Sequence, residues 1–113
     1  MGHLLVHATH ECVGERARAE VVAREAGAAL ECLDGADVAI VDPPRKGLDA
    51  PLAAALAAAP PARVVYVSCD LASFRRDAAL LLGGGRLRLA LLEAWAMFPN
   101  TEHVETLARF DRA

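Results

Sequence analysis

The chain has 113 residues, a formal net charge of −3 and 55% hydrophobic residues, of which few are aromatic. This length suits one small domain or a part of a larger one, and so aliphatic a chain can bury a core, which excludes wholesale disorder. The acidic balance excludes a strongly basic, nonspecific nucleic-acid binder. A local basic site stays open.

The apolar content does not indicate a membrane span. The longest uncharged stretch, residues 50–62, contains three prolines, and a spanning helix needs roughly 20 apolar residues. The N-terminus lacks the basic and apolar regions of a secretory signal. We therefore expect a cytoplasmic protein without membrane contact.

The first third of the chain gives weak structural signals. Residues 4–8 are a short apolar run that could be a strand, and 14–26 set two valines among Glu, Arg and Ala, which is typical of an amphipathic helix. Residues 28–33 are a second short strand candidate.

From residue 36 onward the pattern is clearer. The β-branched run at 36–42 ends at two prolines and is typical of a buried parallel strand. The remaining predicted elements are a helix at 48–59, a strand at 63–68, a helix at 72–82 and strands at 86–95 and 103–110. Alternating strands and helices predict a doubly wound α/β sheet, and the short loop before the last strand predicts an antiparallel pair there. With no linker or repeat, we expect one unit over 1–113.

Three segments at strand ends or turns could carry chemistry. The first is DPPRKG at 42–47, where Asp42 stands at a strand tip before a loop stiffened by two prolines. It could project polar groups over the sheet edge, or it could simply terminate the strand.

The second segment is YVSCD at 66–70. Cys69 follows a predicted strand and precedes a helix, a position that favours the thiolate, and it could equally be a buried structural cysteine. We assign Cys12 and Cys32 to that structural class. The three cysteines lack metal-type spacing, so we expect neither a metal site nor a disulfide framework.

The third segment is FPNTEHVE at 98–105. Glu105 could act as a general base if burial raised its pKa. An exposed acid on an edge strand is the commoner place for a glutamate.

Together, and in this order, the three segments resemble the C-terminal signatures of S-adenosylmethionine-dependent RNA uracil-C5 methyltransferases. The resemblance covers 37–113. It departs from the family pattern at Leu71, where a proline is common, and at Ala96, where an aspartate is usual. Residues 75–77 resemble the helix after the family's cysteine, although alone they would be read as an exposed helix face.

The resemblance implies roles for individual residues. Cys69 matches the nucleophile that adds to uracil C6, and Glu105 matches the base that later removes the C5 proton. Asp42 matches a carboxylate that contacts the cofactor, S-adenosyl-L-methionine. Arg45 is a candidate contact to the substrate, which would be rRNA or tRNA.

The implied fold is a partial class I (Rossmann-like) methyltransferase fold. It would have a mostly parallel sheet, an antiparallel C-terminal strand and helices on the faces. The sequence contains no glycine-rich strand–turn–helix loop of the kind that cradles such cofactors. We therefore expect this chain to be a C-terminal part of the catalytic domain, which an N-terminal half or a second chain would complete.

Two alternatives stay open. The chain could be a truncated or degenerate domain, inactive alone, that serves as a scaffold or as half of a split enzyme. A related methyltransferase acting on another substrate is disfavoured, because nitrogen or oxygen methylation needs no thiol adduct.

Overall fold

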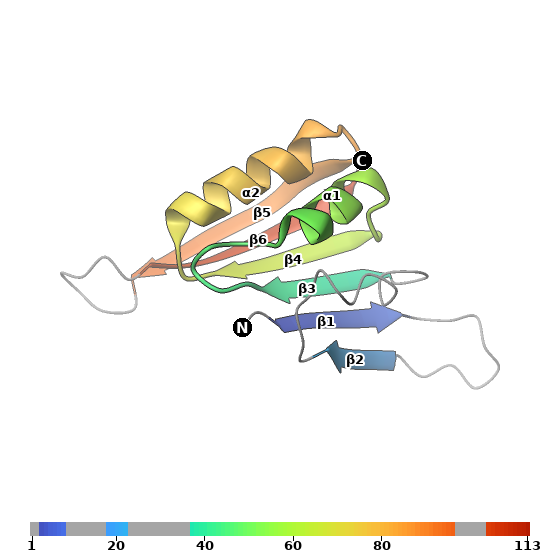
Figure 1. The fold of residues 1–113 in the computed structure, drawn as a ribbon, viewed down its shortest axis with the longest axis horizontal. Coiled ribbons are helices and arrows are strands. Elements are labelled where there is room, and N and C mark those ends of the chain that lie inside the picture. The colour runs from blue at the N-terminus through green and yellow to red at the C-terminus, as the bar shows by residue number, and fades with distance from the viewer. Residues whose placement is uncertain (1–2, 9–17, 23–36, 97–103) are drawn as a thin grey trace.

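The computed structural model describes residues 3–8, 18–22, 37–96 and 104–113, which form one six-stranded sheet and two helices (Figure 1). The helices are α1 (Ala50–Ala58) and α2 (Leu71–Gly83). The strands are β1 (His3–Ala8), β2 (Arg18–Val22), β3 (Val38–Asp42), β4 (Arg63–Ser68), β5 (Leu87–Ala96) and β6 (Val104–Arg112). Their order in the sheet is β2-β1-β3-β4-β6-β5.

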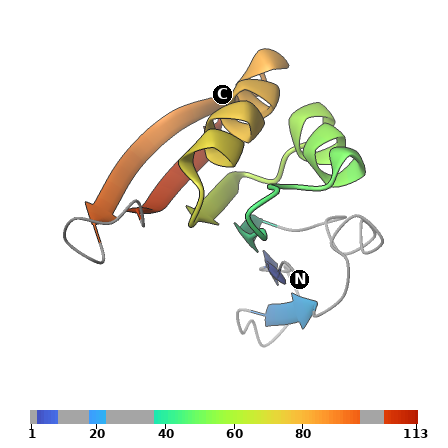
Figure 2. The same cartoon turned by 60° about the vertical axis from the view of Figure 1, so that its left-hand side comes forward.

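The α/β class and the antiparallel final pair, β5 with β6, are confirmed. The sheet is mixed rather than mostly parallel, because among the described strands only β3 and β4 pair in parallel. Both helices lie over the same face of the sheet, not on two faces (Figures 1 and 2). The physical reason is that α1 and α2 join strands that advance in one direction across the sheet, and crossovers of the usual hand then lie on one face.

The prediction of a helix at 14–26 is wrong, because Arg18–Val22 forms β2 and pairs with β1. Val21 and Val22 are β-branched, and pairing with a neighbouring strand overrides a weak helix preference. The strand predicted at 28–33 lies outside the described residues. The six elements predicted after residue 36 are all present, with ends within two residues of the prediction.

The core lies between the two helices and the sheet. Alternate residues of the central strands point toward the helices and are buried, as a period of two requires: Ala39, Val41, Val64, Tyr66, Ala108 and Phe110. Leu52 and Leu56 of α1 and Phe74 and Leu81 of α2 close over them. The rings of Tyr66 and Phe74 meet edge to face, with their centroids 5.3 Å apart. In the part of the chain that the structure describes, neither helix is long and apolar enough to cross a bilayer.

Leu56→Ala should lower the free energy of unfolding by about 2–5 kcal/mol, because it opens a cavity under α1. Leu56 is fully buried, whereas Leu80, on α2, is 52% exposed. Leu80→Ala is therefore the matched control, with an expected change within about 0.5 kcal/mol. Urea unfolding of the two variants measures both values, and equal losses would contradict this placement of the core.

Candidate functional site

The candidate site lies at the edge where β3 and β4 end. Because these strands are parallel, their carboxyl ends meet at one edge, which is where open α/β sheets bind ligands. Asp42 is the last residue of β3 and is exposed. Cys69 follows the last residue of β4 and is an exposed free thiol. The structure therefore brings two of the predicted site residues to the same edge.

Glu105 reaches this edge from β6. The antiparallel pairing of β4 with β6 ends at Ser68 and Thr106, so the next position on each side is Cys69 and Glu105. Residues opposite each other in antiparallel strands have Cα atoms roughly 5 Å apart. Glu105 is partly exposed, while Thr106 beside it is buried toward the helices. The thiol directly follows the last paired residue of β4, and the carboxylate directly precedes that residue's partner on β6.

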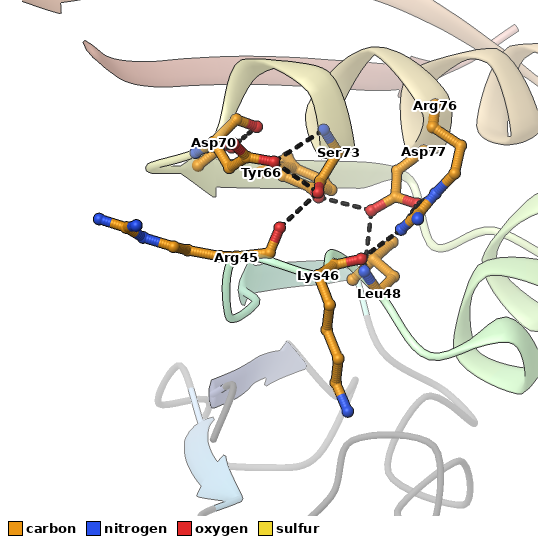
Figure 3. A network of polar contacts seen from close by, with 9 residues as sticks. Arg45, Lys46, Leu48, Tyr66, Asp70, Ser73, Arg76 and Asp77 are labelled. Atoms are coloured by element: carbon orange, nitrogen blue, oxygen red, sulfur yellow. Dashed lines mark hydrogen bonds and ion pairs between the residues drawn. The ribbon is translucent and has the colours of Figure 1, made fainter. Parts of the chain in front are cut away.

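Arg45 lies in the loop between β3 and α1, which we call the 42–48 loop. Its side chain is exposed and points away from the polar network beneath the loop, as does that of Lys46 (Figure 3). The backbone carbonyl of Arg45, in contrast, accepts a hydrogen bond from the Ser73 hydroxyl of α2. The arginine is accordingly free to contact a ligand while its backbone is held.

The centre of that network is Asp77, a carboxylate with only 1% of its side chain exposed. Its Oδ2 accepts hydrogen bonds from the backbone N–H of Leu48 at 2.8 Å and from the Tyr66 hydroxyl at 2.6 Å (Figure 3). Its Oδ1 lies 3.2 Å from the guanidinium of Arg76, which is 56% exposed. Reading 75–77 as an exposed helix face is therefore right for the two arginines and wrong for Asp77.

Tyr66 is a donor in this network. Burial raises the pKa of Tyr66 above its ordinary value of 10.0, and the hydrogen bond to Asp77 raises it further. The hydroxyl therefore stays protonated at physiological pH and donates to the carboxylate. The sequence singled out Tyr66 as the first residue of the YVSCD segment, but nothing local indicates its partner eleven residues away.

Gly47 allows the loop to approach α2. Its N–H bonds to the Pro44 carbonyl at 2.9 Å, and its φ of 90° lies in the left-handed region that favours glycine. A Cβ at this position would lie 2.6 Å from Asp77 Oδ2 and would also overlap the guanidinium of Arg76. The glycine of the DPPRKG segment is thus required by the packing of the loop on the helix.

The turn around Cys69 is fixed by short-range polar contacts. Ser68 Oγ donates to the Asp70 carbonyl at 2.9 Å and accepts from the Asp70 N–H at 3.1 Å. Asp70 caps α2 by accepting the N–H of Ser73 at 3.1 Å. The Ser73 hydroxyl and then its backbone N–H, both bonded to Asp70, hold the pKa of that carboxyl below its usual 3.8.

A basic cluster lies at the opposite end of the sheet. Arg63, Arg88 and Arg109 surround Asp111, with N–O distances of 3.0, 3.7 and 3.3 Å. Burial raises the pKa of Asp111, but the bond from Arg63 and the charges of the other two arginines outweigh it, so the net shift is downward. The described residues contain no group of three or more His, Cys, Asp or Glu side chains that could hold a metal ion.

The comparisons with known proteins agree with these motifs. No family model matches the chain. It is 41% identical over 83 residues to an RNA methyltransferase of Protochlamydia amoebophila, covering 74% of this chain and 21% of that protein. It is 47% identical over 72 residues to an RNA methyltransferase of Thermosynechococcus vestitus, covering 64% and 16%. The chain therefore spans about a fifth of the length of these relatives or less.

One solved structure is similar to the chain in both sequence and fold. The tRNA (uracil-54, C5)-methyltransferase of Pyrococcus abyssi, in complex with S-adenosyl-L-homocysteine, is 42% identical, with a TM-score of 0.59. The match covers 67% of this chain and 18% of that one. The resemblance to RNA uracil-C5 methyltransferases is confirmed. The sheet and helices described here are accordingly part of a Rossmann-like methyltransferase fold.

Gly47→Ala should lower the free energy of unfolding by about 2 kcal/mol or more, because a positive φ alone costs roughly 1–2 kcal/mol for a residue with a Cβ. The overlap with Asp77 adds to that cost. Gly83→Ala is the control, since a Cβ there meets nothing within 4 Å and it lies in α2. That variant should be neutral or slightly more stable. Thermal unfolding separates the two, and an unaffected Gly47→Ala would refute the close approach.

Asp70→Asn should lose stability at neutral pH and lose less in acid. A carboxyl whose pKa is depressed by folding stabilises the native state above its unfolded value, here near 3.8, and that contribution disappears as the pH falls through the folded value. Urea unfolding of the variant and of the parent chain, from neutral pH down through that range, measures the difference. A difference that does not change with pH would mean that the carboxylate charge contributes nothing.

Proposed function

We propose that residues 1–113 form a C-terminal part of the catalytic domain of an RNA (uracil-C5)-methyltransferase that uses S-adenosyl-L-methionine. The observation that carries the proposal is the neighbouring placement of Cys69 and Glu105 at the ends of β4 and β6. A thiol and a separate carboxylate are the pair that methylation of a uracil carbon needs. The alternative of a degenerate copy is not favoured, because both groups remain at the same sheet edge.

The thiol serves as the nucleophile. Uracil C5 is a weak carbon nucleophile until the Cys69 sulfur adds to C6, forms a C–S bond and moves electron density to C5. The exposure of Cys69 suits this step, since a uridine must leave its stack to meet the thiol. S-adenosyl-L-methionine, when bound, supplies the methyl group that C5 takes up.

Glu105 serves as the general base in the second half of the reaction. Once C5 is methylated, the carboxylate takes the C5 proton, the C5–C6 double bond re-forms and the C–S bond to Cys69 breaks. The free thiol and methylated uridine result. This role is supported by the position of Glu105 next to Thr106, which pairs with the residue before Cys69.

Among the described residues, Asp42 is suited to contact the cofactor. Asp42 presents an exposed carboxylate at the carboxyl end of β3, which suits a cofactor bearing positive charge on its sulfonium and amino groups. The sequence holds no glycine-rich loop for the remaining contacts. We propose that these come from a further part of the catalytic domain, on the same chain or on a second one. Arg45, exposed beside Asp42, is proposed to contact the RNA.

Incubation of this chain, together with the rest of the catalytic domain, with RNA containing 5-fluorouridine and S-adenosyl-L-methionine should give a covalent complex that survives denaturing electrophoresis. Fluorine replaces the proton that Glu105 would remove, so the C–S bond to Cys69 persists. Cys69→Ser should abolish the complex, whereas Cys12→Ser and Cys32→Ser should retain it. A complex that still forms in Cys69→Ser would contradict the assignment of Cys69 as the nucleophile.

With ordinary uridine RNA, Glu105→Gln should accumulate a methylated adduct, because addition proceeds and elimination stalls. Mass spectrometry of the cysteine-containing peptide identifies the adduct. If Glu105→Gln released methylated RNA at the parent rate, the base would have to be another group.

A further inference from the structure

The 42–48 loop is attached to α2 through its backbone. The Leu48 N–H donates to Asp77, the Lys46 carbonyl accepts from Arg76, and the Arg45 carbonyl accepts from Ser73 (Figure 3). Three hydrogen bonds thus join main-chain atoms of the loop to side chains of the helix. The path of the loop is therefore fixed independently of what its own side chains do.

The same helix carries the turn that holds Cys69. α2 begins at Leu71, and its cap, Asp70, accepts from the Ser73 hydroxyl at 2.6 Å. That hydroxyl lies within hydrogen-bond distance of both the Asp70 carboxylate and the Arg45 carbonyl, and it can donate its single proton to either acceptor. Ser73 therefore touches the loop that starts at Asp42 and the turn that contains Cys69.

A buried carboxylate costs desolvation free energy, so stability alone does not explain its use to hold a loop. An ionised group without exposure is tolerated only when it is paired and hydrogen-bonded, and an apolar core would often be as stable. Asp77 meets that condition with donors from three places: the loop, β4 and its neighbour Arg76. What an apolar residue could not provide is an acceptor for the Leu48 N–H, and hence a fixed end for the loop.

We propose that Asp77 and Ser73 are positioning residues for the methyl transfer. Their hydrogen bonds attach the 42–48 loop to the helix that follows Cys69, so that the Asp42 carboxylate and the thiol keep a fixed position relative to each other. This inference rests on the proposed function for its catalytic consequence. The attachment of the loop to α2 is a property of the folded chain and can be measured without RNA or cofactor.

The structure offers a matched pair of variants for the test. Asp77→Asn weakens the bond to Leu48, whereas Tyr66→Phe removes the other donor to the same oxygen and leaves the loop contact in place. Both disturb the core near Asp77, so a purely structural role would affect them alike. Arg75→Ala, at an exposed position on α2, controls for changes to the helix surface.

The first measurement is amide hydrogen exchange of Leu48 in the full chain, normalised to the amides of β4 to remove effects of global unfolding. Asp77→Asn should accelerate exchange of Leu48 about tenfold, the size expected when a neutral amide oxygen replaces a charged acceptor. Tyr66→Phe and Arg75→Ala should leave this ratio unchanged. Equal exchange ratios for Leu48 in Asp77→Asn and Tyr66→Phe would contradict the proposal that Asp77 holds the loop.

The second measurement is steady-state methylation of uridine RNA. Asp77→Asn and Ser73→Ala should raise the KM for S-adenosyl-L-methionine and lower kcat, and Ser73→Thr, which keeps the hydroxyl, should restore both. If Asp77→Asn loosened the loop and yet matched Tyr66→Phe in KM and kcat, the positioning role would be refuted. If the parent chain, completed by the rest of the catalytic domain, neither bound cofactor nor methylated RNA, the proposed function would fail, and the exchange ratio would still test the attachment of the loop.

Discussion

The hydrogen bonds to the buried carboxylate of Asp77 are the constraint on which the arrangement of the site depends. An uncompensated charge at 1% exposure would cost several kcal/mol, so the fold must deliver donors to it. It does so with the Tyr66 hydroxyl from β4 and the Leu48 N–H from the loop after β3. Satisfying one buried group thereby joins the ends of two neighbouring parallel strands to the helix that follows the second of them.

This constraint also explains the local sequence of the loop. The chain can bring the Leu48 N–H to Asp77 only if the preceding residue packs without a side chain against the helix, which Gly47 does at φ 90°. The turn from Pro44 to Gly47 leaves the side chains of Arg45 and Lys46 in solvent and their carbonyls on α2. Backbone anchoring and side-chain exposure are thus two results of one turn.

The sequence predicted the elements after residue 36 well, because β-branched runs, prolines and glycines there agree with one another. It also placed Asp42 and Cys69 at predicted strand ends, which lie at one edge of the sheet, while the roles of these residues and of Glu105 stay predictions. It failed at Arg18–Val22, where pairing with β1 outweighed local helix preference. It also failed at Asp77, whose donors are 29 and 11 residues away. A local reading of a charged helix residue predicts exposure, and only the folded arrangement reverses it.

The groups proposed to react and the groups that hold them are separated in this fold. Cys69 and Asp42 are exposed and Glu105 is partly exposed, as the proposed contact with a large polar substrate requires. Exposed side chains at strand ends would ordinarily be free to move, because few neighbours restrain them. Here hydrogen bonds of Ser68 and Asp70 restrain the turn around the thiol. Hydrogen bonds from Ser73 and to Asp77 restrain the 42–48 loop. The hydrogen bonds restrain the backbone around the proposed reactive residues and leave the Cys69 thiol and the Asp42 carboxylate exposed.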